Sequence, residues 1–159
     1  MSPIKNFLDA LEVASIRNQC RLFMTNDTSE INPIQQLSWY LRTYKKENKN
    51  GKLKCFLFKN NGKNCGFGLI RQSFGKYWIT GGLKLTQRGK GLGKILFNDI
   101  VRNVPSSDVW LEVLGSNIAA KKIYNTLGFK KFSETETNGK KVIVMKLTKE
   151  KNINEKIRL

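Results

Sequence analysis

Apolar positions in the first part of the chain follow helical spacing. Phe7, Leu11 and Ala14 share one face of a helix that we predict over residues 4–24. A polar segment, TNDTSE, comes next and carries no apolar side chain. The pattern therefore predicts one amphipathic helix followed by a loop.

A second helix is predicted to begin at Asn32 and to end at the sequence KNG at 49–51. Asn32 can cap the first turn, Pro33 fits its first position, and Gln35 can bond back to the cap. The spacing of apolar residues predicts the face that is buried: Ile34, Leu37, Leu41 and Tyr44.

From Lys52 onward the pattern changes to short apolar runs separated by turn residues. Tight turns at NNGK and SFGK join three predicted strands, and an NGK turn joins a closing hairpin. A predicted helix over 90–103 should bury Leu92, Ile95, Leu96 and Ile100. The other predicted elements are strands at 53–58, 65–71, 76–85 and 108–114 and a helix at 117–128.

This order of helices and strands predicts one mixed α/β layer protein. We expect a single domain over residues 1–147, followed by a polar tail over 148–159. No apolar run approaches the roughly 18 residues that a membrane span needs, and the start of the chain lacks the features of a signal peptide. We therefore expect a cytoplasmic protein with no membrane partner, either a monomer or a homodimer.

The composition adds a strong positive charge to this picture. Lys and Arg number 29 against 12 acidic residues, which gives a net charge of +17. Such a surplus favours anionic partners, including nucleic acid and phosphorylated small molecules. The lysines are scattered along the chain, and this favours a diffuse solvated charge over a dedicated nucleic-acid surface.

Histidine is absent, which excludes His-dependent catalytic triads and the commonest zinc ligand. The three cysteines, Cys20, Cys55 and Cys65, show no CxxC spacing. Hairpin pairing around NNGK places Cys55 near Gly68 rather than Cys65. We therefore expect reduced thiols and no metal site.

The stretch QRGKGLGK at 87–94 lies between a predicted strand and the start of a predicted helix. The first turn of a helix leaves backbone N–H groups without partners, and glycines let an anion approach them closely. The spacing fits neither a P-loop nor a dinucleotide fingerprint, but it fits R-x-x-G-x-G. It predicts a main-chain site for a diphosphate, with added attraction from Arg88, Lys90 and Lys94. The alternative is a glycine-rich turn that caps an ordinary helix.

Taken together with QRGKGLGK, the segment WLEVLGSNIAAKKIYNTLGF at 110–129 resembles the GNAT superfamily of N-acetyltransferases. Its L-E-V, S-N, A, Y and L-G-F pattern is similar to bacterial ribosomal-protein N-acetyltransferases, and the resemblance covers residues 76–147. It implies a mixed, mainly antiparallel sheet of about six to seven strands, splayed at the cofactor site and flanked by about four helices.

The resemblance also implies that acetyl-CoA is the co-substrate and that its pantetheine arm pairs with the strand at 81–85. Gly81 and Gly82 suit a bulge that separates this strand from its neighbour at 108–114. Asn117 fits the family's asparagine near the cofactor and is equally a plain helix cap. The residues implied in acetyl-CoA binding are Leu83, Leu85, Arg88, Gly89, Lys90, Gly91, Leu92, Gly93, Lys94 and Asn117.

Two residues match the family's catalytic positions. Tyr124 matches the tyrosine that protonates the CoA sulfur, and a phenol holds its proton at neutral pH; the alternative is a core tyrosine. Glu112 matches a glutamate that acts as general base in the ribosomal-protein enzymes. An unpaired carboxylate within an apolar strand is costly, so the alternative is a structural ion pair with a lysine.

In this fold the acceptor is usually chosen by the first two helices and their loop, and here the run RNQCRLFM…W is faintly similar to nucleotide-amino-sugar N-acetyltransferases. The leading expectation is an N-acetyltransferase for a small amine such as a nucleotide-linked amino sugar. One alternative acceptor is a protein N-terminus or lysine, and an alternative of another class is a GNAT-like nucleic-acid-binding module. The candidate acceptor contacts, of which Trp39 or Tyr40 is alternatively a core residue, are Arg17, Arg21, Met24, Trp39 and Tyr40.

Overall fold

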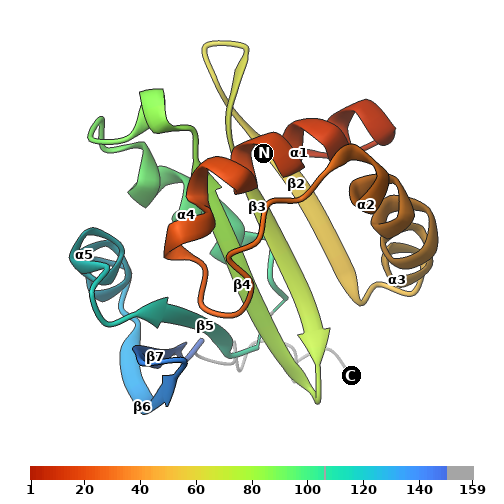
Figure 1. Cartoon of the computed structure of the whole chain (residues 1–159). Coiled ribbons are helices and arrows are strands. Elements are labelled where there is room, and N and C mark those ends of the chain that lie inside the picture. Colours follow the sequence, from red (N-terminus) through yellow and green to blue (C-terminus); the bar gives the residue numbers. More distant parts are fainter. Residues whose placement is uncertain (106, 150–159) are drawn as a thin grey trace, which may run out of the picture.

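One sheet organises the computed structural model, which describes residues 1–105 and 107–149 (Figure 1). Its strands are antiparallel to their neighbours except for the parallel pair β4–β5. This confirms the predicted mixed, mainly antiparallel sheet. In the spatial order β1-β2-β3-β4-β5-β7-β6, the strands are β1 (Ser2–Pro3), β2 (Leu53–Asn60), β3 (Lys63–Ser73), β4 (Lys76–Leu83), β5 (Val109–Leu114), β6 (Lys130–Thr137) and β7 (Lys140–Leu147).

Helices cover both faces of the sheet (Figure 1). On one face lie α1 (Phe7–Cys20), α2 (Pro33–Ser38), the π-helical turn η2 (Trp39–Tyr44) and α3 (Lys45–Lys49). On the other face lie α4 (Leu92–Arg102) and α5 (Ile118–Thr126). Two short 3-10 turns complete the described elements, η1 (Arg21–Phe23) and η3 (Leu85–Gln87).

Alternation along the strands divides the interior into two apolar clusters. In β2, Cys55 and Leu57 face the cluster with α1 and η2, whereas Phe56 and Phe58 face the cluster with α4 and α5. Successive side chains of a strand point to opposite faces of the sheet. Because helices cover both faces here, the side chains on both faces are apolar. No helix of the described residues is long and apolar enough to cross a membrane.

The first helix is shorter than predicted. Asn6 caps it by accepting a hydrogen bond of 3.0 Å from the backbone N–H of Asp9, so the helix begins at Phe7 rather than at residue 4. Residues 4–6 belong to no helix or strand, and Ser2–Pro3 before them form β1, which pairs with β2. Ala14 is buried as expected, while Phe7 and Leu11 are half-buried.

The second helix starts as predicted, but its buried face is different. Asn32 and Gln35 form the expected capping box, with two reciprocal bonds of 2.9 Å. The side chains that are buried are Gln36, Tyr40 and Tyr44. The turn η2 is π-helical and therefore wider than an α-helical turn. Residues on one face of a π-helical turn are further apart in sequence than residues on one face of an α-helix. The prediction was therefore wrong for three residues that are exposed: Ile34, Leu37 and Leu41.

Three smaller expectations also change. β4 ends at Leu83, and Leu85 lies in η3 with 59% of its surface exposed. Ile95 is half-exposed, because α4 buries Phe97 in its place. Cys55 is opposite Leu69 rather than Gly68, since the β2–β3 register shifts at the turn end of the hairpin. All three cysteines are free, as expected. Of the predicted tail over 148–159, residues 150–159 lie outside the described residues.

Candidate active site

The two parallel strands at the centre of the sheet separate after two residue pairs. β4 and β5 are joined at Tyr77–Val109 and Trp78–Trp110 and not beyond, which leaves one edge of β4 unpaired from Ile79 to Leu83. This confirms the predicted splay, but the predicted bulge at Gly81 and Gly82 is wrong, because β4 stays in register with β3 there. The absence of a side chain at Gly82 has another use: a Cβ there would lie 2.6 Å from Cys20 Sγ, so glycine lets α1 pack closely on β4.

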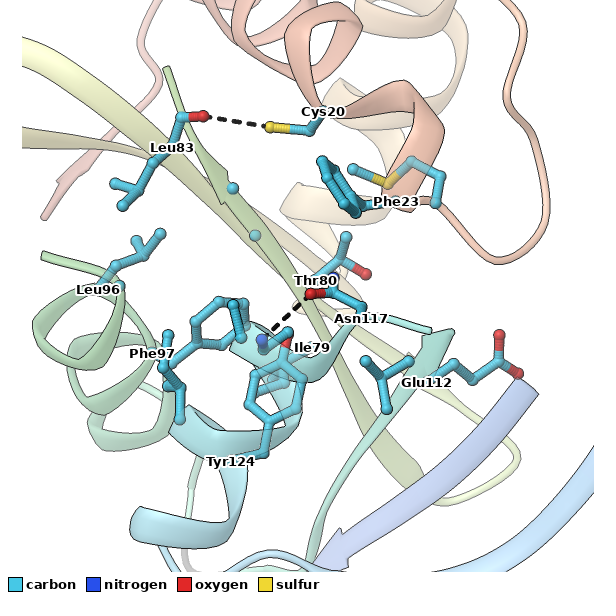
Figure 2. Close-up of a pocket in the computed structure, with 18 of the residues that line it drawn as sticks. Cys20, Phe23, Ile79, Thr80, Leu83, Leu96, Phe97, Glu112, Asn117 and Tyr124 are labelled. Carbon is cyan, nitrogen blue, oxygen red and sulfur yellow. Dashed lines mark hydrogen bonds between the residues drawn. The ribbon is translucent and has the colours of Figure 1, made fainter. Parts of the chain in front are cut away.

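A cavity of about 990 Å³ occupies the splay (Figure 2). Its lining comes from the end of α1 and the following loop, from β3, β4 and β5, from α4 and the loop before it, and from α5. It brings together residues that are far apart in sequence and that were predicted from different motifs: Met24, Leu83, Arg88, Gly89, Gly91, Gly93, Lys94, Glu112, Asn117 and Tyr124.

The loop before α4 presents bare main chain to this cavity. Gly91 is the N-cap of α4, and Gly89 and Gly91 have φ of +74° and +76°, a conformation that favours glycine. A Cβ built on either residue would meet no atom within 4 Å, so both face open space. Among the described residues, the backbone N–H groups of residues 89–93 have no hydrogen-bond acceptor. Such a row of free donors at a helix start fits a diphosphate.

The side chain of Arg88 does not take part in this arrangement as predicted. Its guanidinium donates hydrogen bonds to the Gln19 carbonyl at 2.8 Å and the Leu83 carbonyl at 3.3 Å, and it lies over the ring of Phe23. Arg88 therefore fastens the end of α1 to the end of β4. Lys90 and Lys94 are exposed, so the attraction expected from three cations comes from these two lysines, while Leu92 points into the core.

Tyr124 extends from α5 into the cavity and is only 7% exposed (Figure 2). Phe97 contacts its ring edge-to-face, with ring centroids 4.8 Å apart, and Phe129 lies on another side. Burial raises the pKa of the Tyr124 hydroxyl, because the phenolate would lose its hydration. Within the described part of the chain this hydroxyl makes no hydrogen bond. Tyr124 is thus both a core residue and a protonated donor on the cavity wall.

Glu112 is bonded to the loop after α1 rather than to a lysine. Its Oε2 atom accepts hydrogen bonds from Thr25 Oγ1 at 2.8 Å and from Asn26 Nδ2 at 3.3 Å. Among the described residues Glu112 forms no ion pair, so the alternative of a structural lysine partner is wrong. Figure 2 shows its carboxyl group on a different part of the wall from Tyr124. Thr25 and Asn26 were not predicted, since nothing in a polar loop indicates a contact with a strand 87 residues away.

Asn117 caps α5, as the simpler of its two predicted roles requires. Its side-chain oxygen accepts a hydrogen bond of 3.1 Å from the backbone N–H of Ala120. The residue also lines the cavity, as Figure 2 shows. The cap fixes the first turn of α5 and thereby the helix that carries Tyr124.

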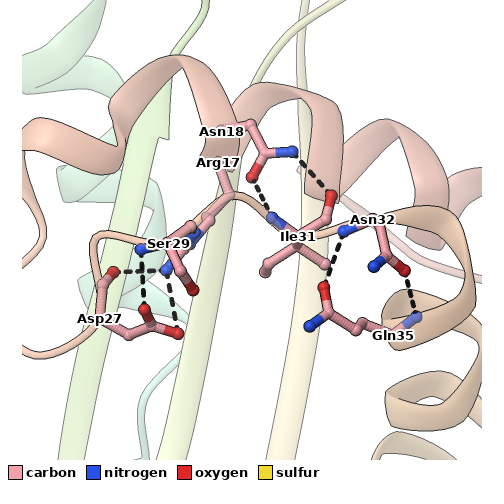
Figure 3. Close-up of polar contacts among 7 residues, drawn as sticks. All are labelled: Arg17, Asn18, Asp27, Ser29, Ile31, Asn32 and Gln35. Atoms are coloured by element: carbon pink, nitrogen blue, oxygen red, sulfur yellow. Dashed lines mark hydrogen bonds and ion pairs between the residues drawn. The ribbon is translucent and has the colours of Figure 1, made fainter.

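The two arginines predicted to contact an acceptor bond to the loop between α1 and α2, as Figure 3 shows for Arg17. Arg17 donates to the carbonyls of Asp27 and Ser29, and Arg21 pairs with Glu30 at 3.1 Å. Asn18 also bonds to this loop, through both backbone groups of Ile31. These contacts fix the position of the loop over the sheet.

The other candidate acceptor residues lie in different places. Met24 lines the main cavity, and Trp39 lines a second cavity beside it. Tyr40 is buried in the core, donates to the Lys5 carbonyl at 3.2 Å and lines neither cavity, which favours its alternative role as a core residue. Among the described residues, no group of three or more His, Cys, Asp or Glu side chains could hold a metal ion.

The family model described as an acetyltransferase (GNAT) domain matches residues 29–149, which is well over half of the chain. The chain belongs to the GNAT acetyltransferase family. Its fold and enzyme class, an acetyl-CoA-dependent N-acetyltransferase, are those that the sequence motifs predicted. No curated protein sequence matches the chain.

Solved structures agree on the GNAT fold at low sequence identity. The Salmonella typhimurium protein yncA, solved with acetyl-CoA, is 17% identical, with a TM-score of 0.72 over 93% of this chain and 94% of its own. A ribosomal-protein-alanine N-acetyltransferase from Brucella melitensis is 14% identical, with a TM-score of 0.72 over 91% and 96%. A variant of spermidine N-acetyltransferase from Vibrio cholerae is 16% identical, with a TM-score of 0.72 over 96% of each chain.

The structural role of Arg88 predicts a loss of stability when it is removed. Arg88→Ala should lower the free energy of unfolding by about 1–3 kcal/mol, because it deletes charged hydrogen bonds to the end of α1. Lys90→Ala, an exposed cation in the same loop, should change it by less than about 0.5 kcal/mol. Urea denaturation followed by circular dichroism measures both, and equal losses would contradict this role.

Proposed function

We propose that this GNAT enzyme transfers an acetyl group from acetyl-CoA to the primary amine of a small molecule, with a nucleotide-linked amino sugar as the leading acceptor. The observation that carries the proposal is the row of unpartnered N–H groups at residues 89–93, beside the open edge of β4. The row suits the diphosphate of acetyl-CoA. The unpaired β4 edge, ending at Leu83, offers backbone groups to the amides of its pantetheine arm.

Transfer forms a C–N bond between the amine and the acetyl carbon and breaks the C–S bond of the thioester. The amine loses a proton, and the leaving thiolate gains one. Tyr124 is the proposed proton donor to the sulfur, since it holds its proton and its hydroxyl has no other described partner. A free thiol has a pKa of about 8.5, below that of the buried phenol. The Tyr124 hydroxyl therefore first stabilises the developing thiolate through a hydrogen bond, and its proton moves to the sulfur as the C–S bond breaks.

Glu112 is the proposed acceptor of the amine proton. Both hydrogen bonds from the α1–α2 loop reach Oε2, so Oε1 has no donor among the described residues and can accept a proton directly or through water. Its position on β5, across the splay from β4 and on the cavity wall, supports this role (Figure 2). In this arrangement the same carboxylate orients the loop and serves the reaction.

The fixed α1–α2 loop supports a small acceptor over a polypeptide. Arg17, Asn18 and Arg21 hold it against α1, and Thr25 and Asn26 hold it against β5. A loop bonded at both ends forms a fixed wall of the cavity, and a concave site with fixed walls suits a small molecule. Arg71 lines the cavity and pairs with Glu47 at 3.8 Å, and its half-exposed guanidinium can also attract an anionic acceptor.

Acetyl-CoA binding and an amine screen together test the proposed function. Acetyl-CoA at micromolar concentration should raise the melting temperature, and a panel of amines should include one whose mass increases by one acetyl group with release of thiol. A panel with UDP-linked amino sugars, polyamines and short peptides decides among acceptors. Binding of duplex DNA with steep salt dependence, without any shift by acetyl-CoA, would instead support the nucleic-acid-binding alternative.

Two glycines with the same backbone conformation offer a matched test of the diphosphate site. Gly91→Leu should weaken acetyl-CoA binding at least tenfold, because its side chain would fill the space in front of the free N–H groups. Gly62→Leu carries the same strain, at a φ of +75° in the β2–β3 turn, and should leave the affinity unchanged. Isothermal titration calorimetry measures both. Normal affinity in the Gly91 variant would rule out this site.

The proton-donor role predicts that Tyr124→Phe lowers kcat by about 100-fold, since a positioned acid contributes about 10²–10⁴. The dissociation constant for acetyl-CoA should stay within twofold. Tyr40→Phe removes a hydroxyl that lines neither cavity, so its turnover should match that of the wild type. Thiol release measures turnover, and an unchanged kcat in Tyr124→Phe would exclude the role.

A further inference from the structure

A second cavity, of about 380 Å³, lies under the α1–α2 segment next to the proposed active site. Three residues line both cavities, Met24 from the loop and the cross-strand pair Leu69 and Thr80 from the sheet, so the two spaces adjoin there. Thr80 is exposed and Leu69 is half-buried, which leaves the sheet surface between them open. A molecule seated at Met24 therefore has access to both.

The second cavity has mainly apolar walls and no uncompensated charge. Its two charged residues, Arg17 and Asp27, pair with each other, and the Arg17 guanidinium also bonds to loop carbonyls. The buried amide of Gln36 donates to the Ala10 carbonyl at 2.7 Å. Because a charged ligand would find no partner here, the cavity suits an uncharged group. The apolar side chains on its walls are Val13, Ala14, Met24, Ile31, Trp39, Phe67 and Leu69.

Trp39 owes its position in this wall to the π-helical turn. Its ring stacks on Tyr44, five residues later, with ring centroids 5.4 Å apart and an angle of 28° between the planes. Residues five apart meet in a π-helical turn, and such turns are frequent at functional sites. The Trp39 side chain is half-buried: it packs against the core cluster of α1 and η2 and also lines the second cavity.

We propose that the second cavity binds a flat, uncharged ring carried by the amine acceptor, with Trp39 as its aromatic contact and Met24 at the junction with the active site. This inference rests on the proposed function and adds the acceptor class. Offset stacking on an aromatic residue favours a flat ring over an alkyl chain of similar size. The volume is sufficient, since an apolar cavity of about 150 Å³ accommodates benzene. The ring can be an aryl group or a nucleobase, which share this chemistry.

Paired acceptors test the proposal on the wild-type enzyme. 2-Phenylethylamine is compared with n-hexylamine, and a UDP-linked amino sugar with the same amino sugar 1-phosphate. We expect kcat/KM to be at least tenfold higher for the ring-bearing member of one pair. A preference in the first pair identifies the ring as an aryl group, and a preference in the second identifies it as a nucleobase. If neither pair shows a preference, the proposal is overturned, whatever the variants do.

Two isoleucines provide a matched pair of variants. Ile31→Trp places a large side chain in the second cavity from its loop side, and Ile34→Trp places one on the exposed face of α2. Ile31→Trp should lower kcat/KM for the ring-bearing acceptor at least tenfold and leave its acyclic partner within twofold. Ile34→Trp should change neither. Equal losses for both acceptors in Ile31→Trp would contradict the proposal.

If Ile31→Trp does not fold, Trp39→Leu is the second variant. We expect Trp39→Leu to abolish the preference for the ring-bearing acceptor and still to acetylate the acyclic amine. Acetyl-CoA binding distinguishes a failure of the ring-binding proposal from a failure of the proposed function. If acyclic amines are acetylated without any preference for a ring, only this inference fails. If acetyl-CoA neither binds nor reacts, the proposed function itself fails.

Discussion

The separation of β4 from β5 is the constraint on which the rest of the site depends. Two residue pairs hold these parallel strands together, and beyond them each strand keeps its other neighbour, β3 or β7. A sheet split in this way exposes backbone hydrogen-bonding groups that would otherwise be paired. Phe97 and Tyr124, from the two helices of one face, contact each other and line the cavity in this split. The cavity is thus a consequence of strand divergence rather than of a missing side chain.

Fewer cations near the cavity are available to an anionic ligand than the net charge of +17 suggests. Several cations near the site are used within the protein: Arg88 bonds to the end of α1, and Arg17 bonds to the α1–α2 loop. The proposed diphosphate site relies on main-chain dipoles, and Lys90 and Lys94 near it are exposed. This division suits an enzyme that must bind a diphosphate in one place and leave the rest of the surface solvated.

Local chemistry explains why much of the fold was predictable and why some of it was not. The capping box at Asn32, the hairpin turns and the glycine loop depend on residues close in sequence, so spacing alone located them. The buried face of α2 could not be predicted, because the π-helical turn that aligns Gln36 with Tyr44 leaves no separate mark in the apolar pattern. The bonds of Thr25 and Asn26 to Glu112 depend on tertiary packing, which spacing does not encode.

The position of Arg88 has a consequence for how the two substrates influence each other. One end of this residue belongs to the loop with the free N–H groups, and its guanidinium holds the last turn of α1, from which the α1–α2 loop departs. In the proposed site, a co-substrate that immobilises the loop also steadies the segment that meets the amine. Thermodynamic linkage makes this effect reciprocal. An amine that orders the segment would therefore raise the affinity for acetyl-CoA. For the proposed site we therefore expect positive heterotropic cooperativity between donor and acceptor, because one residue connects the glycine loop to the last turn of α1.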